Sequence, residues 1–196
     1  VDHLQAQKIN SGSDANLQGA SWIAAKKNAI IADSLMYGDH PAPLFRKEFP
    51  AMGKIQKATL TITAAGYYLA SINGKSIENN VLDPAWTNFS KRIYFSTYDV
   101  TALLKIGINV LGIQLGNGFY NLLPLRMFGR NLINFLPTGE PQLIARLQLT
   151  YTDGRSKSIV SDTSWKTTDG PVMKNNVYLG VHYDARKEIS GWNLTG

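Results

Sequence analysis

Aromatic and amide side chains gather in two segments where proline and glycine interrupt regular structure. Trp86 and Asn88 follow a proline, whereas Asn117, Phe119 and Tyr120 lie in and directly after a Gly-Asn-Gly turn. Aromatic faces stack on the C–H surfaces of sugars, and amide groups bond to sugar hydroxyls. These five residues are therefore candidates for a sugar-binding site. The alternative is that the aromatic rings plug one end of the fold and that the glycines serve only backbone geometry.

Carboxylates are the second group that could do chemistry. Hydrolysis of a glycosidic bond requires two of them, about 5 to 9.5 Å apart across the sugar. Asp99 is interpreted as the cap of a short helical turn, Asp153 as a turn residue before a glycine, and Asp83 as a loop residue before a proline. We therefore predict no catalytic residue in this chain. A pair drawn from Asp83, Asp99, Asp162, Asp184 and Glu188 stays open as an alternative.

Other catalytic motifs fail at single positions. Residues 74–76 read Gly-Lys-Ser, but neither Leu69 nor Ala70 supplies the first glycine that a phosphate-binding loop requires. The histidines, His3, His40 and His182, show neither the spacing of metal ligands nor an adjacent nucleophile. Neither a catalytic triad nor a zinc site is expected.

Composition excludes several classes of function. The chain of 196 residues has no cysteine, so it can form neither a disulfide nor a thiolate metal site. Its net charge of +6 comes from scattered Lys and Arg without a basic stripe, so no nucleic-acid partner is predicted. No apolar run is long enough for a membrane-spanning helix, so no membrane span is predicted.

The elements that would position these side chains are mostly strands. Alternation predicts strands over residues 57–64, with threonines facing outward, and 142–152. A strand over 67–72 leads into Asn73-Gly74, which suits a type I′ hairpin turn. Further strands are expected near the following ranges: 44–50, 92–97, 109–115, 156–160, 165–168 and 177–178.

Short strands and frequent turn signals predict an all-β fold, an antiparallel two-sheet β-sandwich of jelly-roll type with long loops and at most one or two short helices. The helical turn covers residues 100–105, and 121–138 form a long loop. Residues 1–19 are predicted to be a linker or disordered N-terminus, 20–193 the sandwich, and 194–196 the start of a linker to downstream domains.

Three sequence blocks show a family resemblance. They read Leu-Asp-Pro-Ala-Trp-Thr at 82–87, Tyr-Asp-Val-Thr at 98–101 and Leu-Gly-Asn-Gly-Phe-Tyr at 115–120. Further matches are Gly-Tyr-Tyr at 66–68, Ser-Trp-Lys at 164–166 and Tyr-Asp-Ala-Arg at 183–186. Over residues 20–193 the chain resembles the N-terminal β-sandwich module of bacterial α-L-rhamnosidases. It departs from the family at Val181, where a Glu is usual.

The resemblance implies a glycoside hydrolase acting on terminal α-L-rhamnosides by inversion, with its catalytic carboxylates in a helical barrel that follows this module. It implies two partners, a rhamnose-containing glycan and that catalytic domain of the same polypeptide, and a periplasmic or extracellular location. The module itself would be non-catalytic, with sugar-binding loops. The alternatives are a structural buttress for the barrel, which predicts buried Trp86 and Tyr120, and a free-standing lectin-like domain.

The resemblance also implies calcium, because some modules of this kind bind L-rhamnose through that ion. Asp83, Asn117 and Asp184 are the candidate oxygen ligands here. Asp184 also stands two residues before Arg186, so the two side chains share a face of an extended chain and are interpreted as a structural pair.

Overall fold

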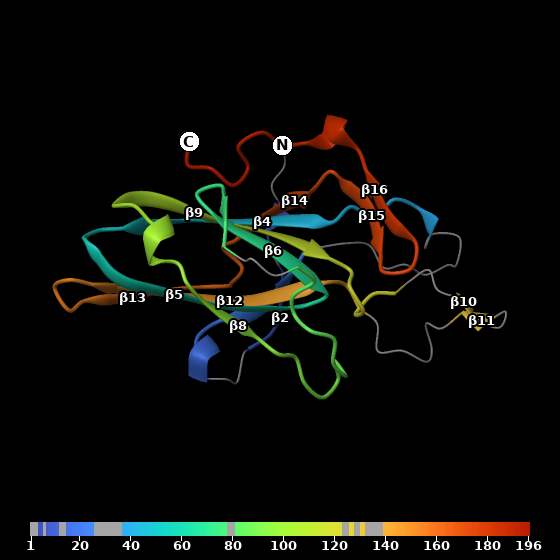
Figure 1. Cartoon of the computed structure of the whole chain (residues 1–196), viewed down its shortest axis with the longest axis horizontal. Coiled ribbons are helices and arrows are strands. Elements are labelled where there is room, and N and C mark those ends of the chain that lie inside the picture. Colours follow the sequence, from blue (N-terminus) through green and yellow to red (C-terminus); the bar gives the residue numbers. More distant parts are fainter. Residues whose placement is uncertain are drawn as a thin grey trace.

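Two antiparallel sheets stacked face to face form the body of the molecule (Figure 1). The computed structural model describes residues 4–5, 7–11, 15–25, 37–77, 81–122, 126–127, 130–131 and 139–196. Among these residues the first sheet has the order β1 (Leu4–Gln5), β14 (Lys166–Asp169), β4 (Pro43–Ala51), β9 (Gly107–Gly116), β6 (Tyr67–Ile72) and β7 (Lys75–Ser76). The second has the order β2 (Gln7–Ser11), β3 (Ser21–Ala24), β12 (Gln142–Tyr151), β5 (Ile55–Ala65) and β8 (Ser96–Asp99), with β13 (Ser156–Val160) also paired to β12.

Two small ladders and three single-turn 3₁₀ helices complete the described elements. The ladders are β10 (Arg126–Met127) with β11 (Arg130–Asn131), and β15 (Val172–Asn176) with β16 (Gly180–Tyr183). The turns are η1 (Ala15–Leu17), η3 (Thr101–Leu103) and η5 (Ala185–Lys187). No described helix has the length and apolar character needed to cross a membrane. The predicted all-β sandwich is confirmed.

The core lies between the two sheets and is built by the alternation seen in the sequence. Leu60 pairs directly with Leu147, and both side chains are fully buried. Alternate residues of β4 and β9, such as Phe45 and Ile113, face them from the other sheet. Trp165 is also fully buried, and its indole N–H donates to the Val160 carbonyl oxygen at 2.8 Å. Period-two patterns therefore predicted β5 and β12 well, because one face of each strand is buried.

The outward face of β5 differs from the prediction. Thr61 and Thr63 are buried, although alternation assigned them to solvent. The Thr63 hydroxyl donates to the Tyr94 carbonyl oxygen at 2.6 Å, so the segment before β8 covers this face. Residues 92–95 cover the sheet instead of pairing with it. The strand predicted over 92–97 therefore begins only at Ser96.

Three further predictions about elements were wrong in part. Residues 177–178 form the turn between β15 and β16, because the Asn176 side-chain oxygen accepts from the backbone N–H groups of Tyr178 and Leu179. Within the predicted N-terminal linker, residues 4–5 and 7–11 pair as edge strands, which need only backbone groups and no side-chain alternation. Of the predicted loop 121–138, residues 126–127 and 130–131 pair with each other, and most of the remainder lies outside the described residues.

Other local predictions are confirmed. Asn73 and Gly74 both have positive φ, 51° and 80°, in the turn between β6 and β7. The helical turn predicted over 100–105 is present but shorter, since η3 covers Thr101–Leu103 with Val100 as its N-cap, and the Asp99 side chain accepts from the Thr101 backbone N–H at 3.0 Å. The assignment of residues 194–196 to a linker stays a prediction, and the Leu194 carbonyl oxygen accepts from Arg46 of the first sheet at 3.0 Å.

Candidate functional site

An exposed aromatic surface lies at one end of the sandwich. The Trp86 ring stacks on Phe119 with centroids 5.1 Å apart and an interplanar angle of 26°. Tyr67 and Tyr178 each contact Phe119 edge-on, with centroids 6.5 Å away. Trp86 keeps 69% of its surface exposed, whereas Phe119 is partly buried beneath it. We call Trp86, Phe119, Tyr67 and Tyr178 the aromatic platform.

Tyr120 points away from this platform. Its ring lies edge-on to Phe89, with centroids 5.2 Å apart, and its hydroxyl accepts from the Gln142 side chain at 3.3 Å. Tyr120 is partly buried. The structure therefore separates two neighbouring residues that the sequence treated as one pair, since only Phe119 supports Trp86.

A close backbone approach holds the loop that carries Phe119. A Cβ atom on Gly66, whose φ is 113°, would lie 2.3 Å from the Gly116 carbonyl oxygen. Only glycine fits there, because any side chain would separate the turn after β5 from the loop after β9. Gly66 thereby brings Tyr67 next to Phe119.

Asp83 anchors the loop that carries Trp86. Its Oδ2 accepts hydrogen bonds from the Tyr98 hydroxyl at 2.7 Å, the Ser96 hydroxyl at 2.9 Å and the Tyr68 hydroxyl at 3.1 Å. The Asp83 carbonyl oxygen also accepts from the Tyr68 backbone N–H at 3.1 Å. Burial is the main reason that the pKa values of both tyrosines are raised, so both hydroxyls stay protonated as donors. The sequence predicted a loop residue but not this anchor, whose donors come from two strands in different sheets.

The two candidate asparagines both make structural bonds. Asn88 is exposed, and its Oδ1 accepts from the Ser90 backbone N–H at 3.1 Å and hydroxyl at 2.6 Å. Asn117 donates from Nδ2 to the Asn175 carbonyl oxygen at 2.7 Å, while its backbone N–H donates to the Asn175 side chain. Asn117 therefore ties the Phe119 loop to the β15–β16 hairpin.

The calcium candidates are engaged in separate interactions. Asp184 pairs with Arg186 at 2.8 Å, and this bond is the largest reason that the pKa of Asp184 is lowered to about 2. Oδ2 of Asp83 and the amide of Asn117 already have the partners given above. Within the described ranges no group of three or more His, Cys, Asp or Glu side chains is placed to hold a metal ion. The arrangement does not supply a ready set of ligands, and calcium binding stays a prediction.

Carboxylates elsewhere in the candidate list also have local partners. Asp99 accepts from both the backbone N–H and the hydroxyl of Thr101, which lowers its pKa. Asp162 accepts from the Ser164 backbone N–H at 2.9 Å, and Glu188 accepts from the Tyr183 hydroxyl. The Asp99 contacts agree with the role interpreted from the sequence, whereas Asp162 and Glu188 were given no local role there.

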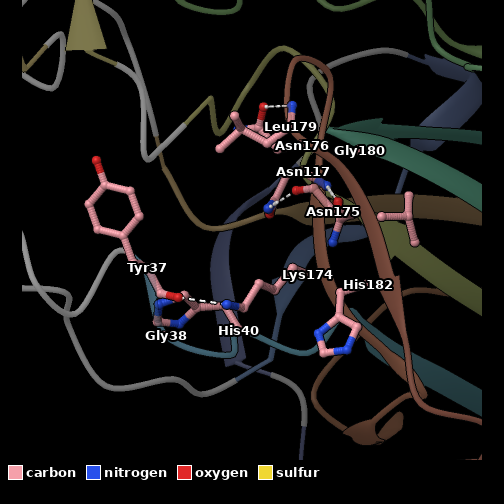
Figure 2. A pocket seen from close by; sticks show the side chains of 11 residues that line it. Tyr37, Gly38, His40, Asn117, Lys174, Asn175, Asn176, Leu179, Gly180 and His182 are labelled. Atoms are coloured by element: carbon pink, nitrogen blue, oxygen red, sulfur yellow. Dashed lines mark hydrogen bonds between the residues drawn. The ribbon is translucent and has the colours of Figure 1, made fainter.

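A cavity of about 210 Å³ lies beside the platform (Figure 2). Tyr37, Gly38 and His40 form one wall, and the β15–β16 hairpin with Lys174 and His182 forms the other. Asn117 also lines it, two residues before Phe119. Sequence reasoning missed this cavity, because His40 and His182 are far apart in the chain and no local pattern relates them.

Comparison with known proteins shows the family. Residues 53–196 match the model of the α-L-rhamnosidase N-terminal domain. An α-L-rhamnosidase of Formosa agariphila is 37% identical over 162 residues, which cover 79% of this chain and 16% of that protein. One of Streptomyces avermitilis is 38% identical over 144 residues, covering 73% of this chain and 13% of that protein.

Solved structures agree with this family. The native α-L-rhamnosidase of Aspergillus terreus superposes with a TM-score of 0.81 at 34% identity, covering 92% of this chain and 20% of that one. The Streptomyces avermitilis α-L-rhamnosidase complexed with L-rhamnose gives a TM-score of 0.73 at 35% identity, covering 81% and 15%. The chain spans less than a fifth of the length of these curated relatives. It belongs to the α-L-rhamnosidase N-terminal domain family.

Proposed function

We propose that this chain is the non-catalytic N-terminal module of an α-L-rhamnosidase that hydrolyses terminal α-L-rhamnosides, and that its aromatic platform binds the sugar weakly. Family membership supports the parent activity. The proposed parent uses an inverting mechanism, with a general acid and a general base in another part of the polypeptide. The local partners of Asp83, Asp99 and Asp184 support a chain without catalytic carboxylates.

The single observation that carries sugar binding is the exposed Trp86 stacked on Phe119. A solvent-facing indole supported from below presents a flat apolar face without further rearrangement, as stacking on a sugar ring requires. The buttress hypothesis predicted that Trp86 and Tyr120 are buried, and in this chain Trp86 is 69% exposed whereas Tyr120 is partly buried. Tethering even a weak site to a catalytic domain raises the local concentration of substrate.

Titration calorimetry of the chain with L-rhamnose tests this proposal. We expect saturable heat at millimolar sugar, and at least tenfold weaker binding in Trp86→Ala, because the stacking surface is removed. Met52→Ala is the matched control, since Met52 is equally exposed but lies at the opposite end of β5. The absence of heat from the folded wild-type chain would overturn the sugar-binding proposal. Repeating the titration with calcium and with a chelator shows whether the ion contributes.

One observation favours the buttress as a second candidate function. The β15–β16 hairpin belongs to neither main sheet and exposes five large hydrophobic side chains in and after its turn: Val177, Tyr178, Leu179, Val181 and Tyr183. Apolar groups on a projecting hairpin suit contact with another domain. Amide hydrogen exchange of this hairpin can be compared between the longer polypeptide and this chain alone. The comparison distinguishes a hairpin that docks on another domain from one that stays exposed. Slower exchange only in the longer protein supports docking.

A further inference from the structure

The cavity beside the platform brings together one lysine and two histidine side chains from two separate segments of the chain. Lys174 on β15 pairs directly with His182 on β16, so their side chains lie on the same face of the ladder. The His40 backbone N–H donates to the Met173 carbonyl oxygen at 2.9 Å, which places His40 beside Lys174. Figure 2 shows Lys174 between residues 37–40 and the strand that carries His182.

The polar lining of this cavity contains several hydrogen-bond donors, of which the Asn117 and Asn176 amide groups already donate to the carbonyl oxygens of Asn175 and Leu122. No carboxylate is among its described lining residues, which instead include the Lys174 ammonium group, two imidazoles and the Asn117 and Asn176 side chains. Lys174 donates to the Tyr37 carbonyl oxygen at 2.7 Å and lies 3.7 Å from Asp39. An ammonium group has three donor hydrogens, so these contacts leave capacity for one more acceptor. The lining therefore favours a ligand that carries negative charge.

The carboxylate of Asp39 does not cancel this preference. Its distance of 3.7 Å from Lys174 is longer than a hydrogen bond, and both side chains are about half exposed. Ion pairs of this kind contribute little free energy, because water screens them. An incoming anion competes with Asp39 for Lys174, and this weak pair costs little free energy to break.

Size and position relate the cavity to the platform. A volume of about 210 Å³ is below the range of drug-sized pockets and suits a single small group or sugar ring. Leu179 lines the cavity, and its neighbour Tyr178 contacts Phe119. A glycan stacked on Trp86 would thus have its next residue close to the cavity mouth.

We infer that this cavity is a subsite for an anionic sugar substituent, a carboxylate or a sulfate ester, on the residue next to the one that stacks on the platform. Lys174 supplies the positive group and His182 a donor group that bind it, at the wall formed with His40. The inference rests on the proposed function, since it assigns a second contact to the same glycan. It implies selectivity for acidic over neutral glycans.

NMR titration of backbone amides with matched probes tests this subsite. D-glucuronate and D-glucose 6-sulfate carry the two anionic groups, and D-glucose is the neutral reference. We expect saturable shifts around Lys174 and His182 with an acidic probe and none with D-glucose. Lys174→Gln and His182→Asn should each weaken acidic-probe binding about tenfold, because a charge-assisted hydrogen bond is lost. Lys54→Gln, between β4 and β5, is the control and should leave the affinity unchanged.

The outcomes separate this inference from the proposed function. Shifts with D-glucuronate alone assign the subsite to a carboxylate, and shifts with the 6-sulfate alone assign it to a sulfate ester. L-rhamnose binding that is lost in Trp86→Ala, together with no shift from either acidic probe, overturns the subsite and leaves the platform intact. Acidic-probe binding that Lys174→Gln and Lys54→Gln weaken equally also overturns it, because general surface charge would then explain the binding. Acidic-probe binding without any L-rhamnose binding keeps the anion site and rejects the platform.

Discussion

At the scale of single residues, Asp83 does more than its place before a proline suggests. Three hydroxyl groups donate to one of its oxygens, and they come from Tyr68 on β6 and from Ser96 and Tyr98 on β8. These strands belong to different sheets, so Asp83 joins the sheets at the end where Trp86 lies. The sequence analysis also named Asp83 as a calcium candidate. Both roles depend on the ability of a carboxylate to accept several bonds.

Removal of this anchor should destabilise the fold. We expect Asp83→Ala to lower the free energy of unfolding by about 2 to 4 kcal/mol, because three bonds to a charged acceptor are lost and the mostly buried Tyr68 hydroxyl loses a partner. Urea denaturation followed by circular dichroism measures the change. Asp169→Ala, at the exposed end of β14, is the control and should change stability by less than about 0.5 kcal/mol. Equal midpoints for the two variants would contradict the anchor.

Asp184 allows a prediction about pH. Its pKa is lowered from 3.8 to about 2, chiefly by the hydrogen bond from Arg186. A lowered pKa means that the ionised form stabilises the fold above about pH 4, and that this contribution is lost as the pH falls toward 2. NMR titration of the carboxyl carbon should give a midpoint near 2, and Arg186→Gln should move it up toward 3.8. Arg155→Gln, which removes the partner of Asp153 instead, should leave the Asp184 midpoint in place.

At the scale of elements, the C-terminal segment packs across the outer face of the first sheet at Gly112. A Cβ atom on Gly112 would lie 2.7 Å from the Asn193 Cβ and 2.9 Å from the Trp192 ring. The Asn193 side chain donates to the Ser71 hydroxyl at 3.0 Å, and Lys105 donates to the Thr195 hydroxyl at 2.8 Å. Gly112 is therefore needed for this packing rather than for a special backbone angle.

Substitution of Gly112 should release this segment. We expect Gly112→Ala to cost about 1 to 3 kcal/mol of unfolding free energy, because the added methyl group overlaps Trp192 and Asn193. Limited proteolysis should then cleave within residues 188–196 faster than in the wild type. In a Trp192→Ala background the same substitution should cost less, since one of the clashing groups is gone. An equal cost in both backgrounds would argue against the contact.

At the scale of the whole molecule, both sheets contribute to one core cluster. Phe45 and Ile113 of the first sheet belong to the same cluster as Leu60 and Leu147 of the second. Neither sheet could keep its inner face buried without the other, so the sheets should not unfold separately.

This shared core predicts a single cooperative transition. Near-ultraviolet and far-ultraviolet circular dichroism should report the same midpoint on heating, and the calorimetric enthalpy should equal the van't Hoff enthalpy. Two resolved transitions, or an early loss of the near-ultraviolet signal, would show that the sheets unfold independently. The four tryptophans lie in different parts of the fold, so the near-ultraviolet signal samples more than one region.

Strands with one apolar face toward the core were predictable from the sequence, because that face gives β5 and β12 an apolar residue at every second position. Turn positions such as Asn73-Gly74 were also predictable, since their backbone angles exclude most residue types. The edge strands 4–5 and 7–11 and the turn at 177–178 were not, because backbone groups and the Asn176 side chain form them without a distinctive pattern.

For the candidate site, the sequence by itself identified Trp86, Phe119 and the glycines that carry their loops, because residue type determines what can stack and what can turn tightly. Only the tertiary structure showed that Tyr120 packs on Phe89 while Phe119 supports Trp86. It also showed that Asp83 accepts bonds from three hydroxyl groups. Only the tertiary structure brought His40 next to Lys174 and His182. These contacts depend on which strands lie beside one another, and long-range pairing leaves no periodic signal in the local sequence.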